Sequence, residues 1–361
     1  MKKIVLMAVL FFVGVMACTN DKDEMLGPGP VVSPVVYNPA AMPYDSLSTY
    51  HFFNGSMADL DPVQGVLPFE PTTPLFSDYA HKSRFVWMPP GAQARYVDDH
   101  KPLDFDEGTI LIKNFWYDNV QPGDLKQVIE TRLLFKRNGV WEFANYVWND
   151  AQTEATLDLS GSFKSLQWLD DNNQAHDVVY RVPSEAECFV CHKRNNLPEP
   201  IGPKPRNLNS TYQYADGAMN QLDKWVAAGY LENNLPATIE ATAKWDDPSV
   251  DINDRVRAYV DMNCAHCHSD DKHCNYRPMR FAWEETSDPV NLGICVEPDE
   301  QINADLTHIV ARGATERSVL FYRISATDET VRMPLLGRSV VHQEAVQLFG
   351  DWINGLSPPC N

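Results

Sequence analysis

The stretch Thr131-Arg132-Leu133-Leu134-Phe135, followed by Arg137-Asn138-Gly139, decides the fold of the first half of the chain. β-branched and aromatic residues in a short run of this kind favour a strand. Asn138-Gly139 favours a tight hairpin turn, because these two residue types adopt the positive φ angles that such a turn requires. The stretch therefore predicts two antiparallel strands that meet at this turn.

Runs of the same kind lie on both sides of this hairpin. They are Arg84–Trp87, Thr109–Ile112 and Val178–Tyr180, and the turn-forming residues Asp170–Asn173 precede the last of them. Strands separated by turns of this kind are typical of antiparallel sheets. We therefore predict an antiparallel β-rich domain over residues 46–183.

The N-terminal end of the chain is typical of an exported lipoprotein. Two lysines precede an apolar run from Ile4 to Ala17, and Cys18 follows it. A basic start, an apolar core and a small residue before the break make an export signal. The run is shorter than the roughly 20 residues that span a bilayer. Val15–Cys18 resembles the lipobox of bacterial lipoproteins, in which the cysteine is acylated.

These features predict a signal peptide over residues 1–17, lipidation at Cys18 and an acidic, Pro-rich tether over residues 18–45. Several acyl chains on one cysteine anchor a protein far more firmly than one chain does. No aspartate follows Cys18 directly, so we predict delivery to the outer membrane. Both the periplasmic side and the cell surface stay open.

Two five-residue segments carry the chemistry: Cys188-Phe189-Val190-Cys191-His192 and Cys264-Ala265-His266-Cys267-His268. Each has the C-x-x-C-H spacing that attaches a c-type haem. On a helical turn, cysteines three apart lie on one side and can each bond to a vinyl group of the porphyrin, while the next imidazole reaches the iron. We therefore predict two covalently bound haems, with His192 and His268 as axial ligands.

Zinc and redox-active cysteine pairs are the alternatives for these segments. A four-cysteine zinc site needs reduced thiolates and leaves both histidines unexplained. An oxidising exterior also disfavours free thiols, and a thioredoxin-like pair belongs in a βαβ context that the local pattern lacks. Haem is therefore the favoured interpretation.

The second motif lies between two predicted helices. Asn253 and Asp254 can cap a helix that leads into Cys264, and a terminal helix is indicated by apolar residues at spacings of three and four. Those residues are Ala345, Val346, Phe349, Trp352, Ile353 and Leu356. Met333 lies before the last helix and is predicted to complete His/Met ligation of the second haem. This order resembles a class I cytochrome c domain.

For the first haem the sequence does not single out a second axial ligand. Met219 lies downstream of the motif, whereas Met88 and His81 come from the β-rich domain. If none of them binds, the iron is five-coordinate and open to small molecules. Of the remaining cysteines, Cys274 with Cys295 and Cys295 with Cys360 are equally open as disulfides.

The chain also resembles a known family. Thr73–Ala80, Tyr146–Asp150 and Asn263–His268, together with the first motif followed by Pro200–Pro203, resemble the uncharacterised dihaem c-type cytochromes found beside parallel β-helix repeat proteins. The resemblance covers residues from about 50 to the end. It implies covalent dihaem binding and an exported location. Cys274 is a third late cysteine that departs from the family pattern.

The predicted fold class is α+β: the β-rich domain is followed by a mainly α-helical cytochrome c-like dihaem region. That region comprises a first haem-binding segment over residues 184–250 and a class I cytochrome c-like domain over residues 251–361. The predicted function is electron transfer by an exported, lipid-anchored dihaem cytochrome. A dihaem redox enzyme of the peroxidase kind, with an open first haem, and a surface binding module with a structural metal are the alternatives.

Net charge bears on the partner. The chain has 49 acidic and 30 basic residues, a formal net charge of −19. A charge of this sign disfavours nucleic acid as a partner. It favours either a redox protein with a basic docking face or simply the solubility of an exported protein.

Overall fold

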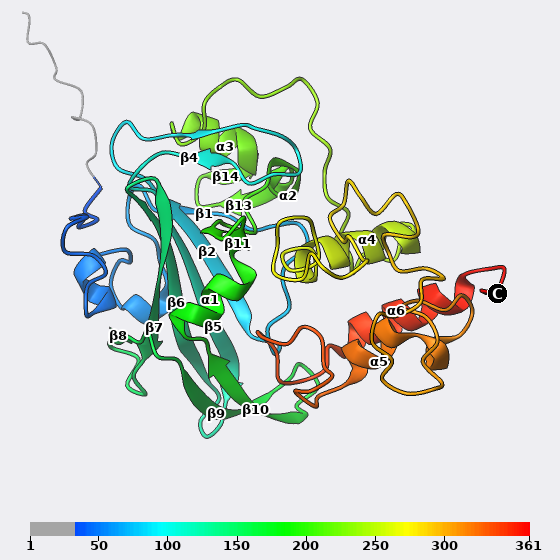
Figure 1. Cartoon of the computed structure of the whole chain (residues 1–361). Helices are drawn as coiled ribbons and strands as arrows, with labels where there is room; N and C mark the ends of the chain where they lie inside the picture. The colour runs from blue at the N-terminus through cyan, green and yellow to red at the C-terminus, as the bar shows by residue number, and fades with distance from the viewer. Residues whose placement is uncertain (1–32) are drawn as a thin grey trace, which may run out of the picture. The chain divides into compact units, whose positions relative to one another are not determined.

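The computed structural model describes residues 33–361, which form one compact unit (Figure 1). The predicted signal peptide, Cys18 and the first part of the predicted tether lie outside the described residues. Within the rest of the predicted tether, Met42 is buried in the apolar core that also contains Ile110 and Ile112. Of the helices in residues 33–361, none has the length and apolarity needed to cross a bilayer.

A large antiparallel sheet forms the centre of the described unit. Its path runs in the order β1-β2-β5-β6-β7-β8, with β9 paired to β5 and β10 paired to β9. The strands are β1 (Leu67–Pro68), β2 (His81–Trp87), β5 (Ile110–Val120), β6 (Leu125–Arg137), β7 (Val140–Trp148), β8 (Ala155–Leu157), β9 (Ser162–Leu169) and β10 (Ala175–Val182).

The hairpin predicted at Asn138-Gly139 joins β6 to β7, and both residues have positive φ angles, 54° and 75°. The second predicted turn joins β9 to β10 and has Asn173 at φ 58°. These turns form where predicted because short polar residues and glycine tolerate left-handed backbone.

The two faces of the sheet meet different surroundings. Ile110 and Ile112 of β5 pack into a core that includes the N-terminal residues Met42 and Tyr50. Leu111 and Phe115 point to the opposite face, because side chains alternate along a strand, and belong to two other apolar clusters. This second face carries the candidate site.

Short elements connect the sheet to the rest of the chain. The small strand pairs are β3 (Ala94–Arg95) with β4 (Asp104–Phe105), β11 (Lys193–Arg194) with β12 (Leu197–Pro198), and β13 (Thr211–Tyr214) with β14 (Gly217–Asn220). The helices are α1 (Glu185–Cys191), α2 (Pro205–Leu208), α3 (Gln221–Ala227), α4 (Ile252–Asn263), α5 (Val319–Ser325) and α6 (Gln343–Gly355), with single 3₁₀ turns at Leu47–Tyr50, Met57–Asp59 and Thr315–Arg317.

The predicted fold class is wrong in its second half. Residues 184–361 are not a mainly α-helical cytochrome c-like region: only α4 and α6, with 12 and 13 residues, exceed two turns. Between Cys264 and Thr315 the described chain consists of turns, bends and isolated bridges. Asp, Asn, Ser and Pro are frequent there and satisfy backbone groups locally in turns rather than in a helix.

The two helices predicted from periodicity are present. α4 buries Val256, Tyr259 and Val260, and α6 buries Phe349 and Ile353 in the same apolar cluster. The cap of α4 is Asp251, whose carboxylate accepts from the Asn253 N–H at 2.9 Å, and not Asn253 or Asp254. The positions of the two predicted helices are therefore confirmed. The prediction that helices fill most of the region is wrong.

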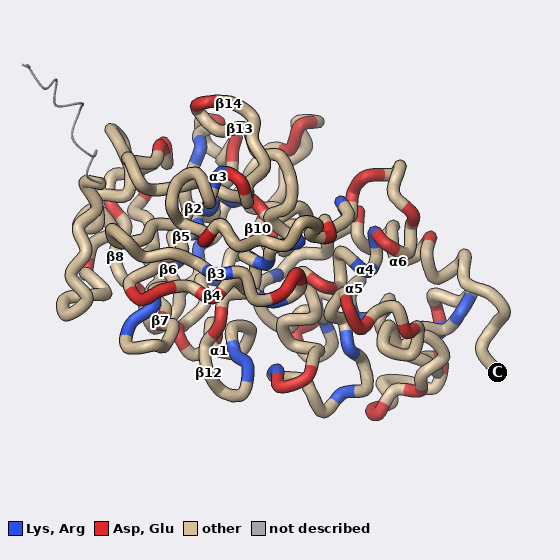
Figure 2. The backbone as a smooth tube through the Cα atoms, turned by 90° about the horizontal axis from the view of Figure 1, so that it is seen from above, with Lys and Arg blue, Asp and Glu red and all other residues tan. Residues whose placement is uncertain are grey.

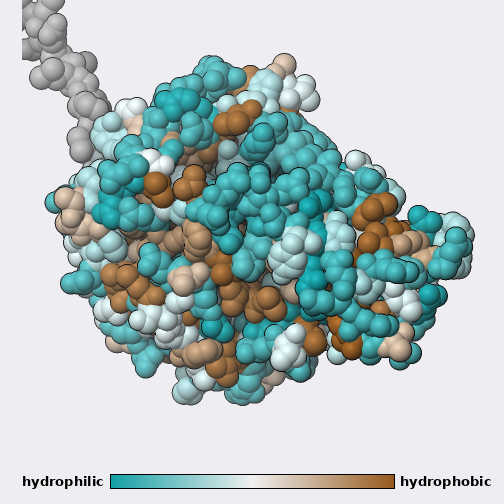
Figure 3. All heavy atoms as spheres, viewed as in Figure 1, coloured by the Kyte–Doolittle hydropathy of each residue, from teal (hydrophilic) through white to brown (hydrophobic). Residues whose placement is uncertain are grey.

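Hydrophilic residues cover most of the face seen in Figure 3. Figure 3 shows apolar atoms in separate groups among hydrophilic ones on the face seen in Figure 1. Figure 2 marks the positions of acidic and basic residues along the chain, with acidic positions frequent on the loops around α4, α5 and α6. This surface is consistent with the acidic composition.

Candidate functional site

The first C-x-x-C-H motif lies on α1 and its C-terminal end. A reciprocal capping box starts this helix: Glu187 N–H donates to Ser184 Oγ at 3.3 Å, and Ser184 N–H donates to the Glu187 carboxylate at 3.0 Å. Such a box satisfies two free backbone donors and fixes where the helix begins. It therefore sets the orientation of Cys188 and Cys191, one helical turn apart.

The sheet holds this short helix in place. Asn145 of β7 donates from Nδ2 to Pro183 O at 2.6 Å and lies 3.6 Å from the Cys188 sulfur. Cys188 is buried, and burial raises the pKa of its thiol. The thiol is therefore protonated at neutral pH when no metal is bound.

His192 is oriented by a single backbone acceptor. Its Nδ1 lies 3.0 Å from Glu199 O, and because a carbonyl only accepts, Nδ1 carries the proton. The ring also meets Phe143 edge to face, with centroids 5.5 Å apart. Burial lowers the pKa of His192 to about 3, so the imidazole is neutral and Nε2 is left with a lone pair. This is the state in which histidine binds a metal.

The second motif follows α4 directly. The His268 N–H donates to Cys264 O at 2.9 Å, which continues the helical path for one more turn. The His268 side chain is buried beside Phe281, and burial lowers its pKa to about 4. Its Nδ1 is buried with no hydrogen-bond partner among the described residues. Burial also raises the pKa of Cys264 to about 12.

Both motifs line one cavity of ≈ 320 Å³. The sulfur atoms of Cys191 and Cys267 and a ring nitrogen of His266 lie within 4.8 Å of one another. The fold therefore brings together two motifs that are far apart in the sequence. Apolar side chains form much of the wall, including Leu75, Phe76, Leu134, Phe143, Ile201, Phe281, Ile309, Leu320 and Phe349.

The residues of this cavity fit covalently bound haem. Each motif presents two cysteines and a neutral histidine. The Nδ1–H of His192 donates to Glu199 O, which is the second hydrogen bond that a metal-binding histidine usually makes. The apolar wall suits a flat macrocycle and excludes water. Cys191, Cys267 and His266 are also close enough to bind a single metal ion.

Met333, the predicted ligand of the second haem, lines the same cavity. Its loop is held by Arg338, a buried residue whose guanidinium donates to Met333 O at 2.8 Å and to Ala326 O at 2.9 Å. The Met333 N–H also donates to Arg323 O at 3.0 Å. Arg338 was not predicted from the sequence, although it follows Met333 by only five residues.

The three candidate ligands for the first haem are placed elsewhere. Met219 is exposed on β14, Met88 is buried in an apolar cluster with Leu103 and Trp225, and His81 is exposed and stacked on Trp116. They are not among the residues that line the cavity. The structure therefore does not bring these three side chains to the first motif.

The late cysteines divide between a disulfide and the cavity. Cys295 pairs with Cys360, one of the two pairings left open by the sequence, across a sequence separation of 65. Cys274 is a free, buried cysteine at the cavity wall, and its N–H donates to Cys267 O at 2.9 Å. A hydrogen bond with Cys267 lowers the pKa of Cys274 to about 7.

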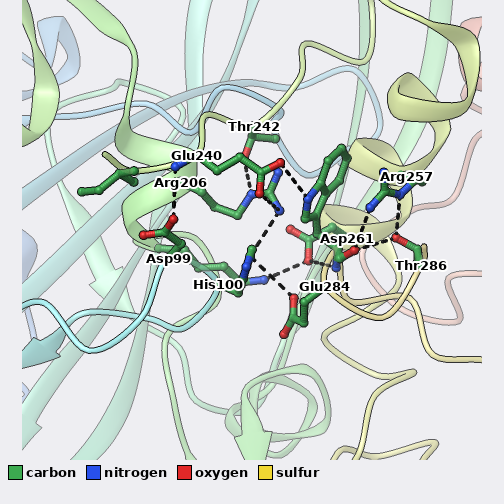
Figure 4. A network of polar contacts seen from close by, with 12 residues as sticks. Asp99, His100, Arg206, Glu240, Thr242, Arg257, Asp261, Glu284 and Thr286 are labelled. Carbon is green, nitrogen blue, oxygen red and sulfur yellow. Dashed lines mark hydrogen bonds and ion pairs between the residues drawn. The ribbon is translucent and has the colours of Figure 1, made fainter. Parts of the chain in front are cut away.

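A polar network supports the segments behind both motifs (Figure 4). Asp261 of α4 accepts from Lys204 Nζ at 3.0 Å and from the Trp283 N–H at 3.2 Å. The Trp283 ring lies between the guanidinium groups of Arg206 and Arg257, 4.1 Å and 3.8 Å from its centroid. This network links the chain that follows the first motif to the helix that precedes the second.

Comparisons of the chain with protein family models, with curated proteins and with solved structures find no match.

Proposed function

We propose that this protein is an exported, lipid-anchored dihaem c-type cytochrome that transfers electrons outside the cytoplasm. The observation that carries the proposal is that both C-x-x-C-H motifs line one cavity with a largely apolar wall. Haem c supplies an iron that cycles between the ferrous and ferric states. The resemblance to the dihaem cytochromes found beside parallel β-helix repeat proteins supports the same function.

Each part of the site has a distinct role in this proposal. Cys188 and Cys191 attach the first haem and His192 binds its iron. Cys264 and Cys267 attach the second, with His268 and Met333 as its axial ligands. Lipidation at Cys18 anchors the protein at the outer membrane, and the acidic surface suits a redox partner with a basic docking face.

The test is a pyridine haemochrome spectrum combined with the intact mass of the mature protein, made in a host that attaches haem c. We expect two covalent haems per chain and a mass that includes the acyl groups on Cys18. A colourless product from a host that matures a control cytochrome would refute haem binding.

A dihaem redox enzyme is the second candidate, because the structure does not bring Met219, Met88 or His81 to the cavity. An open first iron predicts a high-spin signal and cyanide binding at one haem only. Two low-spin haems that do not bind cyanide would rule out this enzymatic function.

A binding module with a structural metal is the third candidate, favoured by the grouping of Cys191, His266 and Cys267. It predicts stoichiometric zinc and no Soret absorbance. Zinc analysis of the same preparation therefore separates it from both haem proteins.

A further inference from the structure

A row of basic residues crosses the sheet at the wall of the cavity. Arg84 of β2 lies opposite Lys113 of β5, and Lys113 lies opposite Arg132 of β6. Asn145 of β7 is the next cross-strand partner, opposite Arg132. All four residues line the cavity.

Carboxylates among residues 33–361 balance the charges in this row only in part. Arg132 pairs with the fully buried Glu130, which also accepts from Tyr180 Oη at 2.6 Å. No carboxylate among residues 33–361 lies within ion-pair distance of Lys113. Its Nζ lies 4.7 Å from the ring centroid of Phe115.

Arg84 is the clearest case. Its side chain is only 7% exposed, and the one carboxylate within ion-pair distance among residues 33–361, that of Glu70, is 3.9 Å away on a side chain that is 55% exposed. Its Nη1 is buried with no hydrogen-bond partner among the described residues. A buried cation without a full set of acceptors costs several kcal/mol, as an order of magnitude. An anion from outside the chain would offset this cost at Arg84, and Lys113 lies opposite Arg84 on the neighbouring strand.

Burial affects both groups in the same direction. Burial, followed by repulsion from Arg84 and Arg132, holds the pKa of Lys113 well below its ordinary value. Burial lowers the pKa of Arg84 to about 10. An anion bound between them would restore the charged state of Lys113.

The row ends at the first motif. Asn145, at one end, contacts the Cys188 sulfur, and Arg84 is three strands away, about 14 Å at the usual spacing of neighbouring strands. In a porphyrin the two carboxylate groups lie across the ring from the vinyl groups that bond to cysteine. A haem attached at Cys188 whose ring extended along the row would therefore bring these carboxylates toward Lys113 and Arg84.

We propose that Arg84 and Lys113 bind anionic oxygen atoms in the cavity, and that these are the propionate carboxylates of the haem attached at Cys188 and Cys191. This inference rests on the proposed function. The same cations could instead take a free carboxylate or phosphate from solution, and the experiment separates these two sources.

The test uses the holoprotein with Lys113→Met and Arg84→Gln, singly and together. Lys126→Met, an exposed lysine on β6 that does not line the cavity, is the matched control. Haem content is counted first, then the two reduction potentials are measured, and resonance Raman spectra record the propionate bending modes. Lys113→Met is the safer variant, because methionine is apolar and close to lysine in length.

We expect two haems in every variant. One potential should shift downward in Lys113→Met and Arg84→Gln, because loss of a nearby cation favours ferric iron, while the other stays unchanged. The propionate modes of one haem should change with it, and Lys126→Met should match the parent protein. Added phosphate or acetate should leave the parent protein unaffected.

Two outcomes would overturn the inference. If the variants keep both haems and show unchanged potentials and propionate modes, the row binds no anion. If phosphate or acetate shifts one potential in the parent protein but not in Lys113→Met, and the propionate modes are unchanged, the anion is free and not the propionate. A preparation without haem would instead refute the proposed function, so the two failures are distinguishable.

Discussion

The two C-x-x-C-H segments have the same spacing but very different surroundings. The first lies on a helix of seven residues against a sheet wall that carries the buried Arg84 and the half-buried Lys113 and Arg132. The second follows a 12-residue helix and borders an apolar cluster that includes Val260, Phe281 and Ile309. His268 also has Arg277, Arg280 and Arg323 nearby, so cations lie close to both motifs but in different arrangements. Because nearby charge and apolar packing tune an iron, we expect two haems with distinct potentials.

The largest test of this comparison is to remove one attachment site at a time. Replacing Cys188 and Cys191 by Ser, or Cys264 and Cys267 by Ser, should lower the covalent haem content from two to one per chain. Because the surroundings differ, the single remaining potential should differ between the two variants. Pyridine haemochrome spectra and redox titration measure both.

Cys274→Ser is the control for these variants, since Cys274 lines the cavity but lies outside both motifs. It should keep two haems. If it loses metal or colour instead, Cys274 belongs to a metal cluster with Cys191 and Cys267, and the comparison of two haem sites fails.

Met333→Leu tests whether the axial ligand belongs to the second site alone. Loss of the thioether should lower one reduction potential and convert one haem from low spin to high spin, because His268 would remain as the sole protein ligand. Electron paramagnetic resonance and redox titration are the measurements. Met279→Leu, at another methionine of the cavity wall, should change neither. Equal shifts in both haems would contradict the assignment.

The disulfide should stabilise the second region more than the first. Replacing Cys295 and Cys360 by Ala removes a cross-link across 65 residues, which is worth about 4 kcal/mol in the chain-entropy account. Urea unfolding of the holoprotein measures the loss. The part of the transition reported by the first haem should keep its midpoint if the two regions unfold separately; a common shift would show that they unfold together.

The smallest expected effect is a pH dependence of stability caused by His342. This residue precedes α6 and contacts Phe76 and Tyr259 of α4. Its ring stacks on that of Phe76, with ring centroids 4.0 Å apart, and its Nδ1 is hydrogen-bonded to Tyr259 Oη at 2.9 Å. Burial lowers its pKa from 6.5 to about 4. Between these values the unfolded chain binds the proton and the folded chain does not, so stability is full above pH 6.5 and falls toward pH 4.

This contribution amounts to at most about 3 kcal/mol. His342→Phe should flatten the fall in unfolding free energy between pH 6.5 and 4, measured by urea unfolding at several pH values. His51→Phe, at an exposed histidine, serves as the control and should keep the slope of the parent protein. An unchanged slope in His342→Phe would show that the ring is protonated in the folded state.

Local chemistry made part of the molecule predictable. Asn138-Gly139 specified a hairpin because few other residues accept two positive φ angles, and the apolar periodicity around Val256 and Phe349 specified α4 and α6. The cysteine and histidine spacing specified both motifs. Between the two helices this periodicity stops. The prediction of a mainly α-helical region was wrong because it took two correctly placed helices as typical of a region that consists mostly of loops.

The sequence by itself determined the strands, two helices, the two motifs and the acidic charge, because each depends on residues near one another along the chain. Only the tertiary structure decided that both motifs share one cavity, that Cys295 pairs with Cys360, and that Arg84, Lys113 and Arg132 form a row beside the first motif. Those features depend on strand register and on long-range packing. Many residues act together to set them, so no local pattern encodes them.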